Sequence, residues 1–199
     1  SFNSGYFNES KTVAMHNINL FDEDIPIIVP SGSCAGMMGH DYLQLFEGSP
    51  EFDKVQRFAA RVYDLSQYLD EILQVNYEDK GEKIKVAWHS NCHALRVAKS
   101  VEASKNLIRK FTNVELLELE HEEECCGFGG TFAVKENDIS NAMALAKIDD
   151  IKKTGASYLI SGDGGCLLNI SGTMKRNGVD IKCLHLYDFL IKRLEGAPL

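Results

Sequence analysis

Positive charge is scarce in this sequence of 199 residues, which has 21 lysines and arginines against 29 aspartates and glutamates and a net charge of −8 at pH 7. A surface with that balance attracts neither nucleic acid nor anionic membranes, so neither is expected as a partner. No apolar run approaches the ~18 residues that a membrane-spanning helix needs. Residues 1–6 lack the charged and apolar segments of a secretory signal peptide. We therefore predict a cytoplasmic protein without a transmembrane segment.

A nucleotide-cofactor fingerprint is also missing. The glycines at 127, 129 and 130 follow two cysteines and do not form the strand–GxGxxG–helix unit of flavin or nicotinamide binding. The sequence does contain six cysteines. Without an export signal they are expected to be reduced thiols, and this favours metal or redox chemistry over a disulfide framework. The 44% apolar and 25% charged composition is that of an ordinary globular protein.

Apolar runs and helical spacing alternate along the chain. Short runs typical of buried strands occur at 25–29, 84–88, 114–119, 158–161 and 181–184. Apolar side chains at three- and four-residue spacing predict helices at 9–20, 95–101, 139–153 and 186–194, one after Cys34, and a long one from Ser49 to about residue 73. This alternation predicts an α/β fold with largely parallel strands and cysteine loops at their C-terminal ends.

A short internal repeat relates the two ends of the chain. The segments around Cys34 and Cys166 each read apolar strand, small-residue turn, cysteine and new helix, with three further matches: Ile28 with Ile160, Ser31 with Asp163, and Gly32 with Gly164. The repeat predicts two pseudo-symmetric halves, 1–78 and 79–199, joined by the polar linker 76–83. A first-half counterpart of Cys125-Cys126-Gly127 would fall before Ser1, so we expect the chain to begin inside the first half.

Four cysteines of the second half each follow a predicted strand: Cys92, Cys125, Cys126 and Cys166. In an open α/β sheet such loops gather at one edge, where ligands bind. Adjacent thiols among glycines are poorly explained by core packing, and a disulfide between neighbours would be strained. Four thiolates suit a [4Fe-4S] cluster or an all-cysteine zinc site, and we favour such a metal group over four unliganded thiols.

These cysteines stand in three longer motifs, which resemble the CCG-type cysteine-rich domain: His89-Ser90-Asn91-Cys92-His93, Glu124-Cys125-Cys126-Gly127-Phe128-Gly129-Gly130-Thr131-Phe132 and Gly162-Asp163-Gly164-Gly165-Cys166-Leu167. That family includes the heterodisulfide reductase B subunit, the iron–sulfur subunit of glycolate oxidase and, most similar here, the lactate utilization protein A type. The heterodisulfide reductase pattern ends in Cys-x-x-Cys, whereas Asp163 and Ser31 occupy the first of those positions here. The resemblance covers essentially the whole chain.

The resemblance implies an iron–sulfur (4Fe-4S) electron-transfer subunit of an L-lactate-oxidising dehydrogenase complex. Its partners would be other lactate-utilization subunits, including a ferredoxin-like iron–sulfur protein. Cys92, Cys125, Cys126 and Cys166 would hold the second-half cluster, and Cys34 would be the surviving ligand of a first-half cluster. The alternatives are a zinc-stabilised assembly module without redox chemistry and, ranked last, a thiol–disulfide enzyme using Cys125 and Cys126.

Several polar residues near these motifs have plainer explanations. We expect His89, His93 and His121 to hydrogen-bond beside the site or to be exposed, although as ligands they would make a mixed Cys/His zinc site. Asp163 is expected to stabilise its turn. We expect Arg96 to be solvated, Cys183 to be a small buried hydrophobe, and the acidic run 118–124 to be a solvated loop rather than a docking surface.

Overall fold

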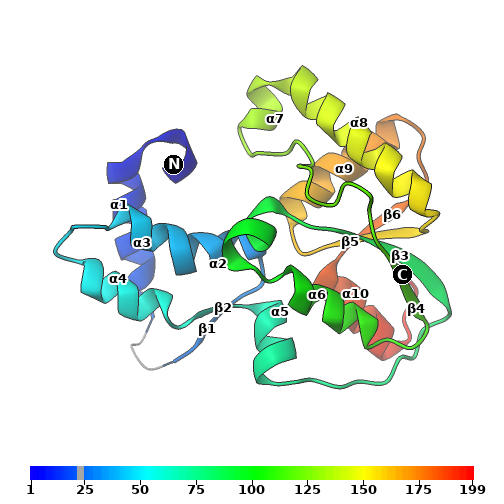
Figure 1. Cartoon of the computed structure of the whole chain (residues 1–199), viewed down its shortest axis with the longest axis horizontal. Coiled ribbons are helices and arrows are strands. Elements are labelled where there is room, and N and C mark those ends of the chain that lie inside the picture. Colours follow the sequence, from blue (N-terminus) through cyan, green and yellow to red (C-terminus); the bar gives the residue numbers. More distant parts are fainter. Residues whose placement is uncertain (22–24) are drawn as a thin grey trace.

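The strands form two parallel sheets in the computed structural model, which describes residues 1–21 and 25–199 (Figure 1). The small sheet pairs β1 (Ile27–Val29) with β2 (Val62–Asp64). The larger sheet has the order β4-β3-β5-β6, and its strands are β3 (Ile84–His89), β4 (Val114–Leu117), β5 (Tyr158–Ser161) and β6 (Lys182–His185). Every pair is parallel. The predicted α/β class with parallel strands is confirmed.

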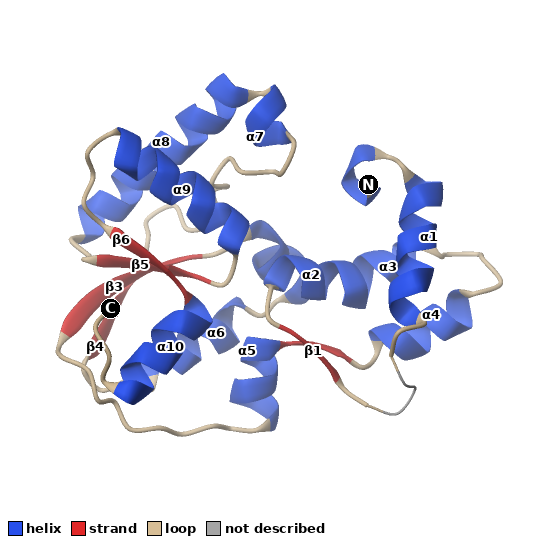
Figure 2. Ribbon diagram, turned by 180° about the vertical axis from the view of Figure 1, so that it is seen from behind, coloured by secondary structure: helices blue, strands red, loops and turns tan. Residues whose placement is uncertain are grey.

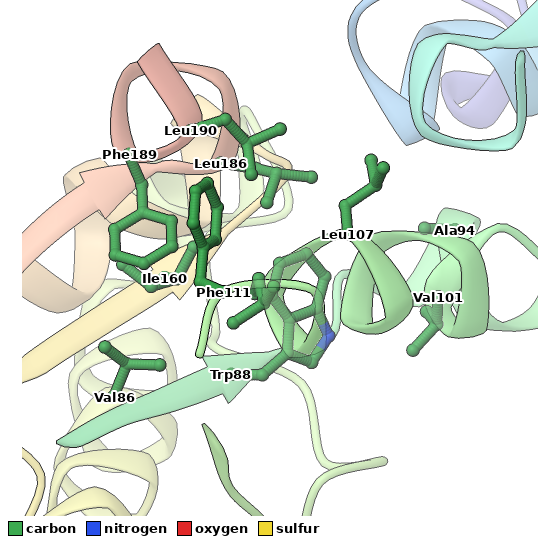
Figure 3. Close-up of a cluster of buried hydrophobic side chains, with 11 residues drawn as sticks. Val86, Trp88, Ala94, Val101, Leu107, Phe111, Ile160, Leu186, Phe189 and Leu190 are labelled. Carbon is green, nitrogen blue, oxygen red and sulfur yellow. The ribbon is translucent and has the colours of Figure 1, made fainter. Parts of the chain in front are cut away.

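Helices cover both faces of the larger sheet (Figure 2). Side chains alternate along a strand, so Val86 and Trp88 of β3 face one way and Ala87 faces the other. The first face packs on α6 (Val101–Arg109) and α10 (Leu186–Glu195), and Figure 3 shows Trp88 among Leu107, Phe111 and Leu186. The second face packs on α8 (Asn137–Thr154) and α9 (Gly164–Arg176). This is a doubly wound sheet between two helical layers.

The strand order reverses beside β3. From β3 the chain passes through α6 to β4, and then through α7 (Phe132–Lys135) and α8 to β5 on the other side of β3. Loops leaving two such strands diverge and leave a crevice at the carboxyl edge of the sheet. The C-terminal ends of β3 and β5 therefore frame the natural binding position of this half.

A helical layer surrounds the two-stranded sheet within the predicted first half, residues 1–78. It contains a 3₁₀ turn (Phe2–Ser4), α1 (Phe7–Ile18), α2 (Gly32–Gly36), a π-helical turn (Met37–Asp41), α3 (Tyr42–Leu45) and α4 (Phe52–Ala59). Its core is formed by Ala14, Ile27, Tyr42, Val55 and Phe58. α2 packs against the π-helical turn Ala94–Ala98 of the second half, where an added Cβ on Gly32 would lie 2.7 Å from Ala94 Cβ. Glycine permits this close approach of the two halves.

The predicted long helix from Ser49 to residue 73 is wrong. α4 ends at Ala59, β2 follows, and α5 (Leu65–Gln67) leads into a π-helical turn at Tyr68–Ile72. Val62 pairs with Ile27 of β1, and the Asp64 side chain accepts a hydrogen bond from the Ser66 N–H at 2.8 Å, which starts a new helix. Because β2 has three residues, it interrupts the three- and four-residue apolar spacing too briefly to be seen in the sequence.

The segment 76–83 is anchored to the second half. The Asn113 N–H donates to Asp79 Oδ2 at 2.8 Å, and the Lys80 N–H donates to the Arg193 carbonyl at 3.2 Å. Asp79 also forms an ion pair with Arg193 of α10, and both side chains are almost completely buried. Among the described residues, no helix combines the length and the apolar character needed to cross a membrane.

Candidate metal centre

Five of the six cysteines line one cavity of about 440 Å³: Cys34, Cys92, Cys125, Cys126 and Cys166. The cavity lies beyond the ends of β3 and β5, because His89, Asp163 and the residues that follow these strands line it. Cys126 and Cys166 are 2% and 8% exposed, whereas Cys34, Cys92 and Cys125 are exposed. The cavity thus has a buried pair of thiols and an accessible set. The four second-half cysteines, predicted to converge from different loops, do lie together.

The Cys125-Cys126 loop is fixed by the two helices behind it. Gly127 has a φ of +83°, and an added Cβ would lie 2.5 Å from the Ser140 carbonyl oxygen, so the backbone here requires glycine. Ser140 Oγ of α8 donates to the Gly127 carbonyl at 2.7 Å, and Asn169 Nδ2 of α9 donates to the Cys126 carbonyl at 2.9 Å. These bonds hold the adjacent thiols toward the cavity.

Asp163 organises the start of α9. Its Oδ1 accepts hydrogen bonds from the N–H groups of Gly165 at 3.0 Å and Cys166 at 3.1 Å, which caps the helix. Its Oδ2 accepts from Ser33 Oγ of the first half at 2.7 Å. The predicted turn role is confirmed, and the carboxylate also links the two halves.

The thiols are close enough to share protons. Cys126 and Cys92 donate hydrogen bonds to the Cys125 sulfur, which lowers the pKa of Cys125 well below its ordinary value. The Gly127 N–H, 3.4 Å from this sulfur, acts in the same direction. Hydrogen bonding to Cys125 in turn raises the pKa values of Cys92 and Cys126. Coupled groups of this kind release their protons as a set. The site therefore stabilises one thiolate strongly and the next ones poorly unless a cation binds.

His89 is buried at the base of this cavity, 1% exposed, and is not the exposed histidine that was one of the two expectations. Neither ring nitrogen has a hydrogen-bond partner among the described residues. A ring nitrogen and the sulfurs of Cys126 and Cys166 all lie within 4.8 Å of one another. Burial lowers the pKa of His89 to about 4, with the nearby Lys147 charge acting in the same direction, so the imidazole is neutral at pH 7. Two thiols and a neutral imidazole are potential ligands for a metal ion.

The other singled-out side chains lie around the centre or away from it. His93 lines the cavity with its Nδ1 3.9 Å from Cys92 Sγ and its Nε2 3.7 Å from Asp41 Oδ2 of the first half. His121 and Arg96 are exposed. Cys183 on β6 packs beside Met174, and burial raises its pKa to about 11. It packs as the small hydrophobe that the sequence predicts, but it is half-buried rather than buried.

The acidic run 118–124 is only partly solvated. Lys105 of α6 is 6% exposed and contacts Glu118 at 2.6 Å and Glu122 at 2.7 Å. Asp150 of α8 accepts hydrogen bonds from the N–H groups of Glu120 and His121, and Lys147 donates to the His121 carbonyl. The segment expected to be a solvated loop is therefore held by α6 and α8, and these contacts fix the backbone that leads into Cys125.

Cys34 was predicted as a ligand of a first-half cluster, and the structure shows it on the rim of the second-half cavity. It arrives there because α2 packs on the π-helical turn that follows Cys92. Sequence spacing predicts that a cysteine stands at the end of its own strand, but carries no signal for which sheet edges face each other. Ser33 likewise had no sequence signal for its bond to Asp163.

Comparison with known proteins agrees with this arrangement. A family model described as a cysteine-rich domain, CCG, matches residues 86–171, which include all four second-half cysteines of the cavity. Lactate utilization protein A of Shouchella clausii is 40% identical over 193 residues, covering 96% of this chain and 80% of the relative. The chain belongs to the lactate utilization protein A family. Two relatives of the same name match over essentially the same length. The protein of Halalkalibacterium halodurans is 38% identical, covering 96% of this chain and 78% of the relative. The protein of Macrococcus caseolyticus is 37% identical, covering 99% of this chain and 80% of the relative.

Proposed function

We propose that this protein is an iron–sulfur (4Fe-4S) electron-transfer subunit of a complex that oxidises L-lactate. The observation that carries the proposal is the convergence of Cys92, Cys125, Cys126 and Cys166 on one cavity, with two of their thiols buried. Thiolates are the usual ligands of iron–sulfur clusters. The family name supports the role in lactate utilization.

Two of the proposed ligands, Cys166 and Cys125, have support from the surrounding backbone. Cys166 lies in the first turn of the 13-residue helix α9, whose positive end favours a thiolate. The Gly127 N–H points to the Cys125 sulfur, and hydrogen bonds of this type tune the potential of a bound cluster. A cluster held here would supply one-electron transfer. The exposed thiols of Cys92 and Cys125 would place it near a partner's redox group, while Cys126 and Cys166 keep its inner side dry.

The assembly follows from the same family membership. We propose a cytoplasmic complex with other lactate-utilization subunits, one of them a ferredoxin-like iron–sulfur protein that exchanges electrons with this one. Residues 1–78 and 79–199 would be the two CCG-type halves, with the complete four-cysteine site in the second. Cys34 would serve a first-half cluster adjoining the same cavity.

A second candidate function is a zinc-stabilised assembly module without redox chemistry. The observation that favours it is the compact group of His89, Cys126 and Cys166, since a mixed set of nitrogen and sulfur donors is typical of structural zinc sites. In that case the cavity would stabilise the junction between the halves rather than carry electrons.

Anaerobic purification followed by iron, sulfide and zinc assays tests the two functions. We expect cluster-type visible absorbance and bound iron, lost in Cys126→Ser because that thiol is at the buried base of the cavity. Cys183→Ser is the matched control and should retain the iron, since Cys183 lies on β6 outside the cavity. Equal loss in both variants would contradict the ligand assignment.

A further inference from the structure

The four cysteines leave one feature of the cavity unused, the imidazole of His89. Its side chain is almost completely buried, it lines the cavity, and neither nitrogen has a hydrogen-bond partner among the described residues. A buried polar group without a partner costs about 1–3 kcal/mol, so such a group calls for an occupant of the site that engages it.

We propose that His89 is a direct nitrogen ligand of the group bound in this cavity, together with Cys126 and Cys166. The site is then a mixed histidine–cysteine centre rather than an all-thiolate one. This inference rests on the proposed function only in requiring that a metal group binds. It holds for an iron–sulfur cluster and for a zinc ion alike.

The spacing of the three atoms favours coordination over a direct hydrogen bond. A ring nitrogen of His89 and both sulfurs lie within 4.8 Å of one another, yet the nitrogen makes no hydrogen bond to either sulfur. Atoms that bind a common metal at about 2.0–2.3 Å surround it without bonding to one another. The three donor atoms form a group small enough for one metal ion to be placed among them.

Rigid elements carry two of the three donors, and a side chain of α9 fixes the loop that carries the third. His89 is the last residue of β3, and its carbonyl accepts a hydrogen bond from Ser161 Oγ of β5 at 2.9 Å. Cys166 is fixed by the Asp163 cap, and Cys126 by Asn169. Asp163 is not a competing ligand, because its oxygens already accept bonds from Gly165, Cys166 and Ser33. Sites on strand ends and helix starts hold ligands better than sites on loops.

Nitrogen ligation changes what the site can do. A neutral imidazole brings one negative charge fewer than a thiolate, and histidine in place of cysteine raises the potential of an iron–sulfur centre. With His89, four second-half cysteines and one imidazole offer five donors, one more than the four irons of a cubane need. One of the exposed thiols, Cys92 or Cys125, is then left without an iron of its own.

Pulsed electron paramagnetic resonance on the reduced, anaerobically purified wild-type protein tests the inference without any mutation. We expect a coupling to a coordinated ¹⁴N nucleus, which changes to the ¹⁵N pattern when the protein is grown with ¹⁵N-labelled histidine. X-ray absorption at the edge of the bound metal gives the same test for iron or zinc. We expect a nitrogen ligand at about 2.0–2.1 Å beside the sulfur ligands.

Two variants assign the nitrogen. His89→Cys should keep most of the metal, lose the nitrogen signal and have a lower potential, whereas His89→Gln should lose most of the metal. His93→Gln is the matched control, because His93 lines the same cavity and should leave the nitrogen signal unchanged. Circular dichroism checks that each variant folds, and the labelled wild-type protein decides the question if one does not.

The outcomes separate this inference from the proposed function. Iron bound with sulfur ligands and no histidine nitrogen would overturn the inference and leave the iron–sulfur proposal standing. Zinc bound with a histidine nitrogen would support the inference and defeat that proposal. A nitrogen signal that persists in His89→Cys would overturn the assignment to His89, and failure to bind any metal after anaerobic reconstitution would overturn both.

Discussion

The turns that carry Cys34 and Cys166 have the same order of strand, turn and helix, but the two cysteines differ in burial and in the helix that holds them. Each cysteine stands five residues beyond the end of a short parallel strand, inside the first helical turn after it. The helix at Cys166 is α9, with 13 residues and a side-chain cap from Asp163; the helix at Cys34 is α2, with five residues, and Ser31 makes no side-chain cap bond. Cys166 is buried and Cys34 is exposed.

The comparison shows that a strand, a turn and a cysteine do not suffice to build a donor site. Cys166 gains its position from a capped helix that packs on a four-stranded sheet, and from the Cys125-Cys126 loop opposite it. Cys34 has two strands behind it, and it reaches a cavity only because the second half provides one.

Replacement of the two equivalent cysteines by serine should have unequal effects on metal content. Cys166→Ser removes a buried donor, so we expect the metal bound by this chain to fall at least about tenfold, in line with the loss of a ligand thiolate. Cys34→Ser should retain the second-half metal, because Cys34 lies on the rim. Metal analysis of both anaerobically purified variants makes the measurement. Equal retention of metal in the two variants would contradict the assignment of Cys166, but not Cys34, as a ligand of the second-half metal.

Arg193→Met should destabilise the second half strongly. The substitution leaves the buried Asp79 carboxylate without its charged partner, and removal of one member of a buried ion pair costs about 3–5 kcal/mol. Lys54→Met in the first half is the control, because Lys54 makes an exposed hydrogen bond to Asn19 and its loss should cost less than about 0.5 kcal/mol. Urea denaturation of both variants measures the difference. A cost below about 1 kcal/mol for Arg193→Met would mean that segment 76–83 is not anchored by this pair.

Removal of the side chain at the two equivalent turn positions, Asp163 and Ser31, should lower the stability of the protein by different amounts. Asp163→Ala loses the cap of α9 and the bond from Ser33, so we expect a loss of about 1–2 kcal/mol in the free energy of unfolding. Ser31→Ala should have an effect near zero, since Ser31 makes no cap bond. Thermal and urea unfolding give both values. A similar loss from the two substitutions would show that the turns are equivalent after all.

The smallest expected effect is a dependence of stability on acid pH. Burial opposes ionisation of Asp79, but hydrogen bonds from Arg193 and from the N–H groups of Gly81 and Asn113 outweigh it and lower the pKa of the carboxyl. The stabilisation is therefore complete above the ordinary pKa of about 3.9 and is lost as pH falls through the folded-state pKa.

Urea denaturation between about pH 5 and pH 3 measures this dependence, and Arg193→Met should show less loss than the wild type. An equal slope in the two proteins would contradict the role assigned to Asp79.

Most elements of both halves were predictable, and the main exception in the first half is the stretch after α4. Ile84 to Trp88 and Tyr158 to Ser161 are apolar runs long enough to identify central strands, and both are strands in the structure. Val62 to Asp64 was missed because three residues of strand lie between helical patterns, and only pairing with β1 makes them a strand. Local sequence carries no such tertiary information.

The candidate site also has features that the sequence predicts and features that it does not. The cysteines could be assigned to one sheet edge because parallel strands bring their carboxyl ends together. The arrival of Cys34 depends on how the halves pack, at Gly32 against Ala94, and no spacing in the sequence predicts that contact. The burial of His89 beside Cys126 and Cys166 likewise depends on tertiary packing. His89 had one usable signal, its place at the end of a predicted strand beside Cys92.

The most direct test of the account is the iron and acid-labile sulfide content of the anaerobically reconstituted full chain, read together with its visible spectrum. The account predicts bound iron and sulfide in equal amounts with cluster-type absorbance, because four thiols converge on one cavity. Stoichiometric zinc without iron under the same conditions would contradict it.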